Sequence, residues 1–295
     1  MKNDNFYKHK KNFFEGWYFK HQAKDFSIAF IPGINISKDG TKYSFIQVIT
    51  KDSSYNIKYD FNDFSISEDK LTIKIKDNIF STKGVILNIK NKDITIKGRL
   101  LYSDITSIKS DIMGPFAYFP FMECVHGVLS LNHKVSGNLF INNEEIKFID
   151  DKGYIEKDSG KSFPKTYLWV QCNDFKIEDM SVMVSIADIP FLGFEFKGCI
   201  AVVYYKGKEY RLATYNGVKL LSYDEKRVII KRGPYKLEIE IKNLSPQSLL
   251  APNGGEMIRT IYENISCGAR FKFYKNKKLL FDLESSNTSF EYVSE

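Results

Sequence analysis

Hydrophobic and polar residues alternate along most of this chain. Segments such as 71–76, 85–90 and 235–242 place Ile, Leu, Val or Tyr at every second position. A period of two is typical of a β-strand that buries one face and exposes the other. Clusters of Gly, Asn, Asp and Lys, for example at 38–40 and 206–208, separate the segments and favour tight turns. The pattern predicts short antiparallel strands throughout, with helix limited to one or two turns near 104–112 and 256–263.

The two halves of the chain resemble each other at an offset of roughly 150 residues. Each half has one tryptophan on its first predicted strand, Trp17 or Trp169, followed by an Ile-Pro pair, and then by further strands in the same order. We therefore predict an all-β fold of two related antiparallel β-barrels in tandem, with very little helix. The predicted domains are residues 1–153 and 154–295, and segment 103–125 is expected to be a long connection. A barrel of about eight strands can hold one small ligand.

Composition and charge narrow the range of functions. Hydrophobic residues make up 43% of the chain and charged residues 27%, as in ordinary globular proteins. The net charge is +7, but only six of the 43 basic residues are Arg, and the Lys residues are scattered over the predicted solvent faces. Nucleic-acid binders more often cluster their basic residues, so no nucleic-acid partner is expected. No apolar run approaches the ~20 residues that span a bilayer, and no signal-peptide core follows the N-terminus, so we expect a cytoplasmic protein.

Standard catalytic and metal-binding signatures are absent from the sequence. The cysteines Cys124, Cys172, Cys199 and Cys267 form no CxxC pair, and we expect free thiols. His126 and His133 are seven residues apart, which on a strand places them on opposite faces. No metal site is therefore expected.

Three segments break the alternation: 13–20, 120–128 and 153–164. They place Glu15, Glu123, Glu156 and Asp158 among bulky aromatic residues. A carboxyl group in apolar surroundings has a raised pKa and can act as an acid. The alternative is that these carboxylates pair with the neighbouring lysines or cap turns. The spacing of Glu256, Arg259 and Glu263 suggests a helical ion-pair ladder, which we interpret as structural.

These irregular segments resemble the tocopherol cyclase family. The resemblance rests on several blocks that occur in order: Gly16–Lys20, Pro120–Gly127 with Ser130, Tyr154–Pro164, Trp169 with Gln171 and Asn173, Ile189-Pro190, Ala213–Tyr215, and Gly255–Glu263. It runs from about residue 13 to the C-terminus. The resemblance implies the two-barrel, lipocalin-like (calycin) architecture shared with carotenoid 1,2-hydratases, in agreement with the strand pattern.

The resemblance also implies a reaction. A tocopherol cyclase protonates the double bond of a prenylated hydroquinone, and the phenol oxygen closes on the tertiary cation to give a chromanol, without a cofactor. On this basis the expected acids are Asp158, Glu123 and Glu15, in that order. The expected substrate-binding residues are Trp17, Tyr18, His126, Tyr154, Trp169, Gln171 and Asn173. The expected ligand is a small hydrophobic prenyl quinol or isoprenoid, and peripheral contact with a membrane is one route by which it would reach the protein.

Ser159 departs from the family pattern, which has Trp at this position. If that Trp shields the site, its loss would open the pocket or remove catalysis. Two alternatives therefore stay open beside the cyclase: a hydratase that adds water to the same cation, and a non-catalytic lipocalin-like module that binds a lipid or isoprenoid. The interface between the barrels is the first place to look for the ligand. The sequence does not fix the oligomeric state.

Overall fold

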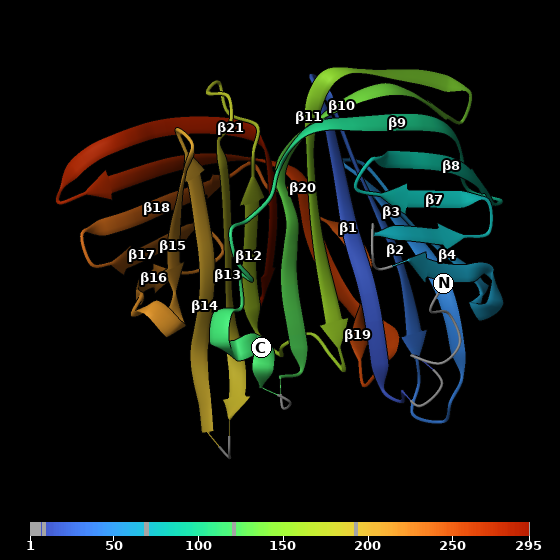
Figure 1. Ribbon diagram of the computed structural model, residues 1–295, viewed down its shortest axis with the longest axis horizontal. Coiled ribbons are helices and arrows are strands. Elements are labelled where there is room, and N and C mark those ends of the chain that lie inside the picture. Colours follow the sequence, from blue (N-terminus) through green and yellow to red (C-terminus); the bar gives the residue numbers. More distant parts are fainter. Residues whose placement is uncertain (1–6, 8–9, 68–70, 120–121, 192–193, 295) are drawn as a thin grey trace.

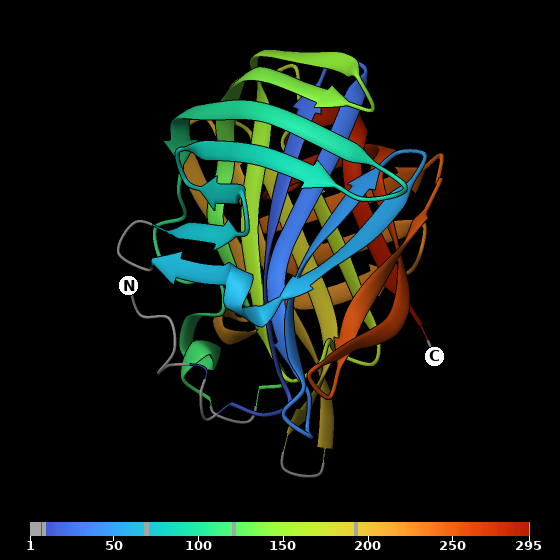
Figure 2. The same cartoon turned by 90° about the vertical axis from the view of Figure 1, so that its right-hand side faces the viewer.

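The computed structural model describes residues 7, 10–67, 71–119, 122–191 and 194–294. They form two antiparallel sheets, each of which curls into a barrel beside the other (Figure 1). The first sheet has the order β4-β3-β2-β1-β11-β10-β9-β8-β7-β6-β5. Its strands are β1 Phe13–Ala23, β2 Phe26–Ile36, β3 Lys42–Thr50, β4 Ser54–Asp60, β5 Phe64–Ser67, β6 Thr72–Ile75, β7 Asn78–Ser81, β8 Gly84–Lys90, β9 Thr95–Thr106, β10 Cys124–Ile141 and β11 Glu144–Gly160. Figure 2 shows how β5 to β9 curl round towards the viewer.

The second sheet has the order β15-β14-β13-β12-β21-β20-β18-β17-β16, and β19 pairs with β20 beside this path. Its strands are β12 Tyr167–Cys172, β13 Ser181–Phe191, β14 Phe194–Tyr205, β15 Lys208–Ala213, β16 Lys219–Tyr223, β17 Arg227–Arg232, β18 Tyr235–Lys242, β19 Gln247–Asn253, β20 Glu256–Lys275 and β21 Lys278–Val293. The only helical elements in the described ranges are the 3₁₀ turns η1 Phe61–Asp63, η2 Gly114–Tyr118 and η3 Thr214–Asn216. The predicted all-β, two-barrel, lipocalin-like fold is confirmed.

The repeat seen in the sequence is also a repeat of topology. In each sheet the first strand of the barrel pairs with the last, β1 with β11 and β12 with β21. Trp17 lies on β1 and Trp169 on β12, so the two tryptophans occupy equivalent strands. The change from one sheet to the other comes between Gly160 and Tyr167. The domain boundary drawn from the sequence, after residue 153, instead falls inside β11.

The burial of the side chains on a strand depends on whether that strand lies at the outside of a barrel or between the two barrels. Outer strands such as β8 alternate between buried and exposed positions, as their sequence predicts. In contrast, β12 is buried at every position and β1 at nearly every one, because one face packs into its own barrel and the other against the neighbouring barrel. Segment 13–20 and the start of segment 153–164 therefore belong to strands with two buried faces, whereas Glu123 in segment 120–128 is exposed. Separate apolar clusters fill the two barrels, and a third lies between them.

Two predicted helical turns are wrong, and one predicted connection is present. Residues 256–263 form the start of β20 and not a helix, so Glu256, Arg259 and Glu263 cannot form a helical ladder. Segment 104–112 is likewise not helical: β9 runs to Thr106, and an irregular stretch leads to η2. Segment 103–125 does contain the expected connection between β9 and β10. Along the described residues, no helix has the length and apolarity needed to cross a membrane.

Candidate functional site

A cavity lies between the two barrels. The first barrel contributes side chains from β1, β2, β3, β10 and β11, and the second contributes them from β12, β13, β14, β19, β20 and β21. The cavity has a volume of about 160 Å³, close to the size that accommodates one benzene-sized ring. Most of its wall is apolar, with Ile31, Phe116, Phe163 and Ile261 among the lining residues.

The alternation of side chains along each strand decides which residues reach this cavity. On β1, Phe14 and Tyr18 line it, whereas Trp17 and Phe19 point into the first barrel. On β11, Glu156 and Asp158 line it, whereas Ile155 belongs to the core of the first barrel. Because successive side chains point to opposite faces of a sheet, a single strand supplies both the barrel core and the cavity wall.

Several polar side chains surround the carboxyl group of Glu156 in the cavity. Its Oε2 accepts hydrogen bonds from the Tyr154 hydroxyl at 2.6 Å and from Trp169 Nε1 at 3.2 Å. His126 Nε2 lies 3.4 Å from the same oxygen. Since both hydrogen-bond donors and the His126 ring nitrogen lie at Oε2, Oε1 is the oxygen available to carry a proton. Burial and the nearby Asp158 raise the pKa of Glu156 to about 7, although His126 opposes the shift.

His126 and Asp158 form an ion pair beside Glu156. His126 Nδ1 lies 2.9 Å from Asp158 Oδ1. Burial lowers the pKa of His126, but the carboxylates of Asp158 and Glu156 outweigh burial and raise it to about 9. The ring is therefore protonated at neutral pH. Cys124 Sγ also contacts Asp158 Oδ1, at 3.5 Å, and burial raises the thiol pKa well above its usual value.

The same three side chains are the group that would have to hold a metal ion. One ligand atom from each of His126, Glu156 and Asp158 lies within 4.8 Å of the others. A protonated imidazole has no lone pair to offer a metal, so a proton and a cation compete for this place. The absence of a metal site therefore stays a prediction.

Two more carboxyl groups line the cavity from the second barrel. Glu263 Oε1 accepts a 2.5 Å hydrogen bond from the Tyr18 hydroxyl, and its Oε2 is buried without a partner. Glu291 Oε2 accepts a 2.7 Å hydrogen bond from the Tyr167 hydroxyl. Burial raises the pKa of both carboxyls to about 8. Repulsion by Glu291 adds to the shift of Glu263, and repulsion by Glu156 and Asp158 adds to the shift of Glu291. Both groups are therefore largely neutral acids near pH 7.

A buried polar seam joins the barrels beyond the cavity. Lys20 Nζ donates to Gln171 Oε1 at 3.4 Å and to the Asn287 carbonyl at 3.0 Å. Asn173 accepts from Gln22 and donates to Asn132 and to the Gly153 carbonyl. Burial lowers the pKa of Lys20 to about 8. Gln171 and Asn173, expected to bind substrate, are thus not among the lining residues and instead hold the two barrels together.

The structure brings some predicted site residues together and places others elsewhere. Asp158, Tyr18, His126 and Trp169 line the cavity, and Tyr154 contacts it through Glu156. Trp17 does not line it, because its ring packs on Phe64 inside the first barrel.

The two other predicted acids lie away from the cavity wall. Glu123 is exposed. Glu15 is buried, with Lys157 Nζ at 2.5 Å and the Tyr7 hydroxyl as partners. Ser159 is paired with Glu15 across the strands and is also absent from the cavity lining. Pro120 and Phe121, which belong to one of the family blocks, lie outside the described residues.

Sequence reasoning missed Glu263, Glu291, Tyr167 and Lys20. The first two are far along the chain from the acids of the first barrel and meet them only because the barrels dock. A signal for Glu263 was present, because on a strand it shares a face with Ile261 and Ile265. An acid in the middle of an apolar stripe is unusual enough to mark a candidate site.

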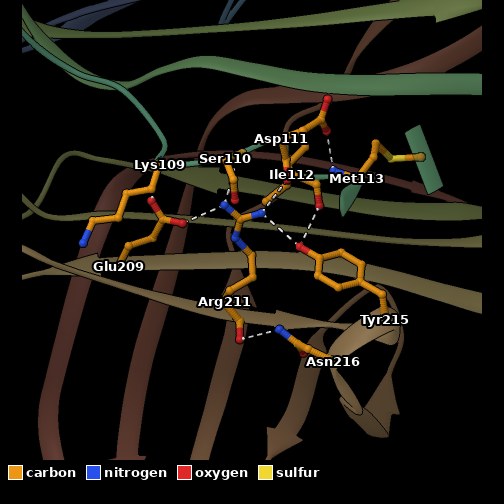
Figure 3. A network of polar contacts seen from close by, with 9 residues as sticks. All are labelled: Lys109, Ser110, Asp111, Ile112, Met113, Glu209, Arg211, Tyr215 and Asn216. Carbon is orange, nitrogen blue, oxygen red and sulfur yellow. Dashed lines mark hydrogen bonds and ion pairs between the residues drawn. The ribbon is translucent and has the colours of Figure 1, made fainter. Parts of the chain in front are cut away.

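The connection between β9 and β10 closes part of the cavity, and we call residues 107–119 the strap. Met113 and Phe116 of the strap line the cavity. Figure 3 shows Arg211 holding the strap: its guanidinium donates to the carbonyls of Ser110 and Asp111 and to the Tyr215 hydroxyl. Glu209 Oε1 pairs with the same guanidinium at 2.6 Å. The ring of Phe116 also packs on Tyr215 and Phe196.

Known proteins resemble this chain in sequence and in fold. Residues 88–222 match the family described as tocopherol cyclase-like, which confirms the resemblance found in the sequence over that segment. A protein of Oryza sativa subsp. japonica named "Probable tocopherol cyclase, chloroplastic" is 31% identical over 152 residues, which cover 48% of this chain. The match spans only 30% of that relative's length.

Two solved structures share the fold. Kievitone hydratase from Nectria haematococca superposes with a TM-score of 0.56 at 12% identity, covering 96% of this chain and 88% of the hydratase. CghA, solved with Sch210972, superposes with a TM-score of 0.56 at 11% identity, covering 95% of this chain and 88% of CghA. At such identity the likeness concerns the fold alone.

Proposed function

We propose, from the tocopherol cyclase-like character of residues 88–222 and the acid group that they contain, that this chain is an intramolecular cyclase. Its substrate would be a prenylated hydroquinone or a related isoprenoid, bound in the cavity between the barrels. The observation that carries the proposal is Glu156, a buried carboxyl that accepts two hydrogen bonds at one oxygen and has the His126 ring beside it, in a wall that is otherwise mainly apolar.

The geometry favours Glu156 over Asp158 as the proton donor. Asp158 is paired with His126, whereas Glu156 is raised in pKa towards neutrality and keeps a proton to give. General acids work best when their pKa lies near the operating pH. Once Glu156 has lost its proton, the imidazolium of His126 stabilises the new carboxylate. Asp158 then acts as a positioning residue that keeps His126 charged.

The chemistry balances without a further reactant. The Glu156 proton adds to the less substituted carbon of the alkene, and a tertiary carbocation forms. Tyr18 and Trp169, whose rings pack edge to face at 5.5 Å, offer aromatic faces for that cation. The phenol oxygen bonds to the cation, and the phenol proton returns to Glu156. The product is an isomer of the substrate.

The volume of the cavity limits which part of the substrate it can hold. A cavity of about 160 Å³ is of the size that takes a small ring compound and is too small for a long isoprenoid chain. The ring and the reacting double bond would therefore occupy the cavity, with the rest of a long chain outside it. A mainly apolar wall keeps water from the cation, which favours ring closure over hydration.

The test is to incubate the full chain with a panel of prenylated hydroquinones and to follow the products by chromatography and mass spectrometry. We expect a product of unchanged mass and altered retention that lacks one phenol. A product heavier by one water would replace the cyclase with a hydratase. Recovery of unchanged substrate bound to the protein would replace it with a binding module.

A further inference from the structure

We infer that Glu263 is a hydrogen-bond donor for an oxygen of the ligand, so that this cavity selects a ring that carries an acceptor oxygen remote from the reacting double bond. The inference deepens the proposed function, on which it rests for the identity of the ring.

The two oxygens of Glu263 have different surroundings. Oε1 accepts the Tyr18 hydroxyl at 2.5 Å, while Oε2 is buried without a partner in the protein. The side chain lines the cavity although the residue is fully buried. A buried polar atom that lacks a partner costs free energy and requires an explanation. A ligand oxygen supplies the missing partner.

The protonation state decides which kind of ligand atom fits. No cationic nitrogen of the described residues lies within ion-pair distance of Glu263, and Lys20 is instead bonded to Gln171 and Asn287. Burial and the neighbouring Glu291 favour the neutral acid. Because Oε1 already accepts from Tyr18, the proton belongs on Oε2. A neutral carboxyl then offers an O–H donor to an acceptor, such as a phenol or carbonyl oxygen.

The position of Glu263 relative to Glu156 defines the spacing of the ligand groups. Tyr18 is bonded to Glu263 and Trp169 is bonded to Glu156, and the rings of Tyr18 and Trp169 contact each other. The two carboxyls therefore flank one aromatic pair. A ring that lies on this pair would present its double bond to Glu156 and its acceptor oxygen to Glu263.

Binding of two small ring compounds tests the inference without any turnover. The probes are 6-hydroxychroman and chroman, which differ only in the oxygen distant from the closed ring, and affinity for the full chain is measured by calorimetry. One satisfied buried donor predicts that wild-type protein binds 6-hydroxychroman about tenfold more tightly. We expect Glu263→Leu to abolish this preference, and Glu263→Gln to keep it, because the amide still donates.

The outcomes separate this inference from the proposed function. Equal affinity for both probes, a preference that survives Glu263→Leu, or no binding of either probe would overturn the role of Glu263. Glu156→Gln serves as the control and should keep the preference. The preference together with failure of every hydroquinone to cyclise would leave the oxygen site standing and remove the cyclase.

Discussion

The indole N–H of Trp169, on the first strand of the second barrel, donates a 3.2 Å hydrogen bond to Oε2 of Glu156, on the last strand of the first. This bond links the two barrels at the group that we propose as the acid. A donor aimed at a carboxylate stabilises the charged form. We therefore expect Trp169 to lower the pKa of Glu156 in addition to forming part of the cavity wall.

Trp169→Phe removes that donor and keeps an aromatic face. Without the indole N–H the pKa of Glu156 rises further, so the acid becomes weaker. We expect turnover to fall by about tenfold, the effect of roughly one hydrogen bond, and the alkaline limb of the pH–rate profile to move to higher pH. Trp17→Phe is the matched control, because Trp17 lies inside the first barrel. An unmoved alkaline limb in Trp169→Phe would show that this bond does not tune the acid.

Glu156→Gln keeps the size of the side chain and removes the proton that the reaction needs. Loss of a general acid lowers turnover by about 10²–10⁴-fold, while the fold is expected to persist because an amide oxygen still accepts from Tyr154 and Trp169. Steady-state rates and thermal melts of the variant measure the two effects. Glu123→Gln provides the comparison, since Glu123 is exposed and outside the cavity lining. Equal rates in both variants would exclude Glu156 as the acid.

The sequence predicted the strands, the repeat and the segments that carry the site, but not the face on which each side chain lies. Trp17 and Trp169 occupy equivalent strands, yet the first points into its barrel and the second into the interface. Strands with two buried faces lose the contrast between apolar and polar positions that normally reveals the orientation.

The sequence also could not predict how the two barrels pack against each other. Tyr18 and Glu263 are separated by 245 positions and share a hydrogen bond. The spacing of Glu256, Arg259 and Glu263, three and four residues apart, predicts a helical ladder. That spacing is equally compatible with a strand, where Arg259 bonds to the backbone carbonyls of Pro164 and Lys165.

The buried carboxyls make the stability of the protein depend on pH. Burial raises the pKa of Glu156 to about 7 and of Glu263 and Glu291 to about 8. Above about pH 4.5 the folded chain then binds more protons than the unfolded chain. The stability that these three carboxyls contribute is fully present below that pH and is lost as the pH rises through 7 to 8. His126, raised to about 9, acts in the same direction between pH 6.5 and 9.

Each such carboxyl contributes a slope of up to about 1.4 kcal/mol per pH unit to the free energy of unfolding. Above pH 8 the slope is partly offset by Lys20, whose lowered pKa makes the unfolded chain the better proton binder there. Urea unfolding of wild-type protein and Glu291→Gln at several pH values from 5 to 8 measures the effect. We expect the variant to lose less stability across this range. Parallel curves would mean that Glu291 titrates normally in the folded chain.

Arg211 is expected to control how long a ligand stays in the cavity. Its guanidinium fixes the strap by its backbone carbonyls, and the strap residues Met113 and Phe116 line the cavity. Arg211→Met removes these bonds and leaves Oε1 of Glu209 without its ion-pair partner, so we expect unfolding to become easier by about 1–3 kcal/mol. Faster hydrogen exchange across residues 107–119 and faster dissociation of 6-hydroxychroman should accompany this loss.

Arg270→Met, which breaks a solvent-exposed ion pair, should change stability by less than about 1 kcal/mol and leave exchange of the strap unaltered. If Arg211→Met lowers stability but strap exchange and ligand dissociation keep their wild-type rates, then the strap does not gate the cavity and Arg211 serves only to join the connection to the second barrel.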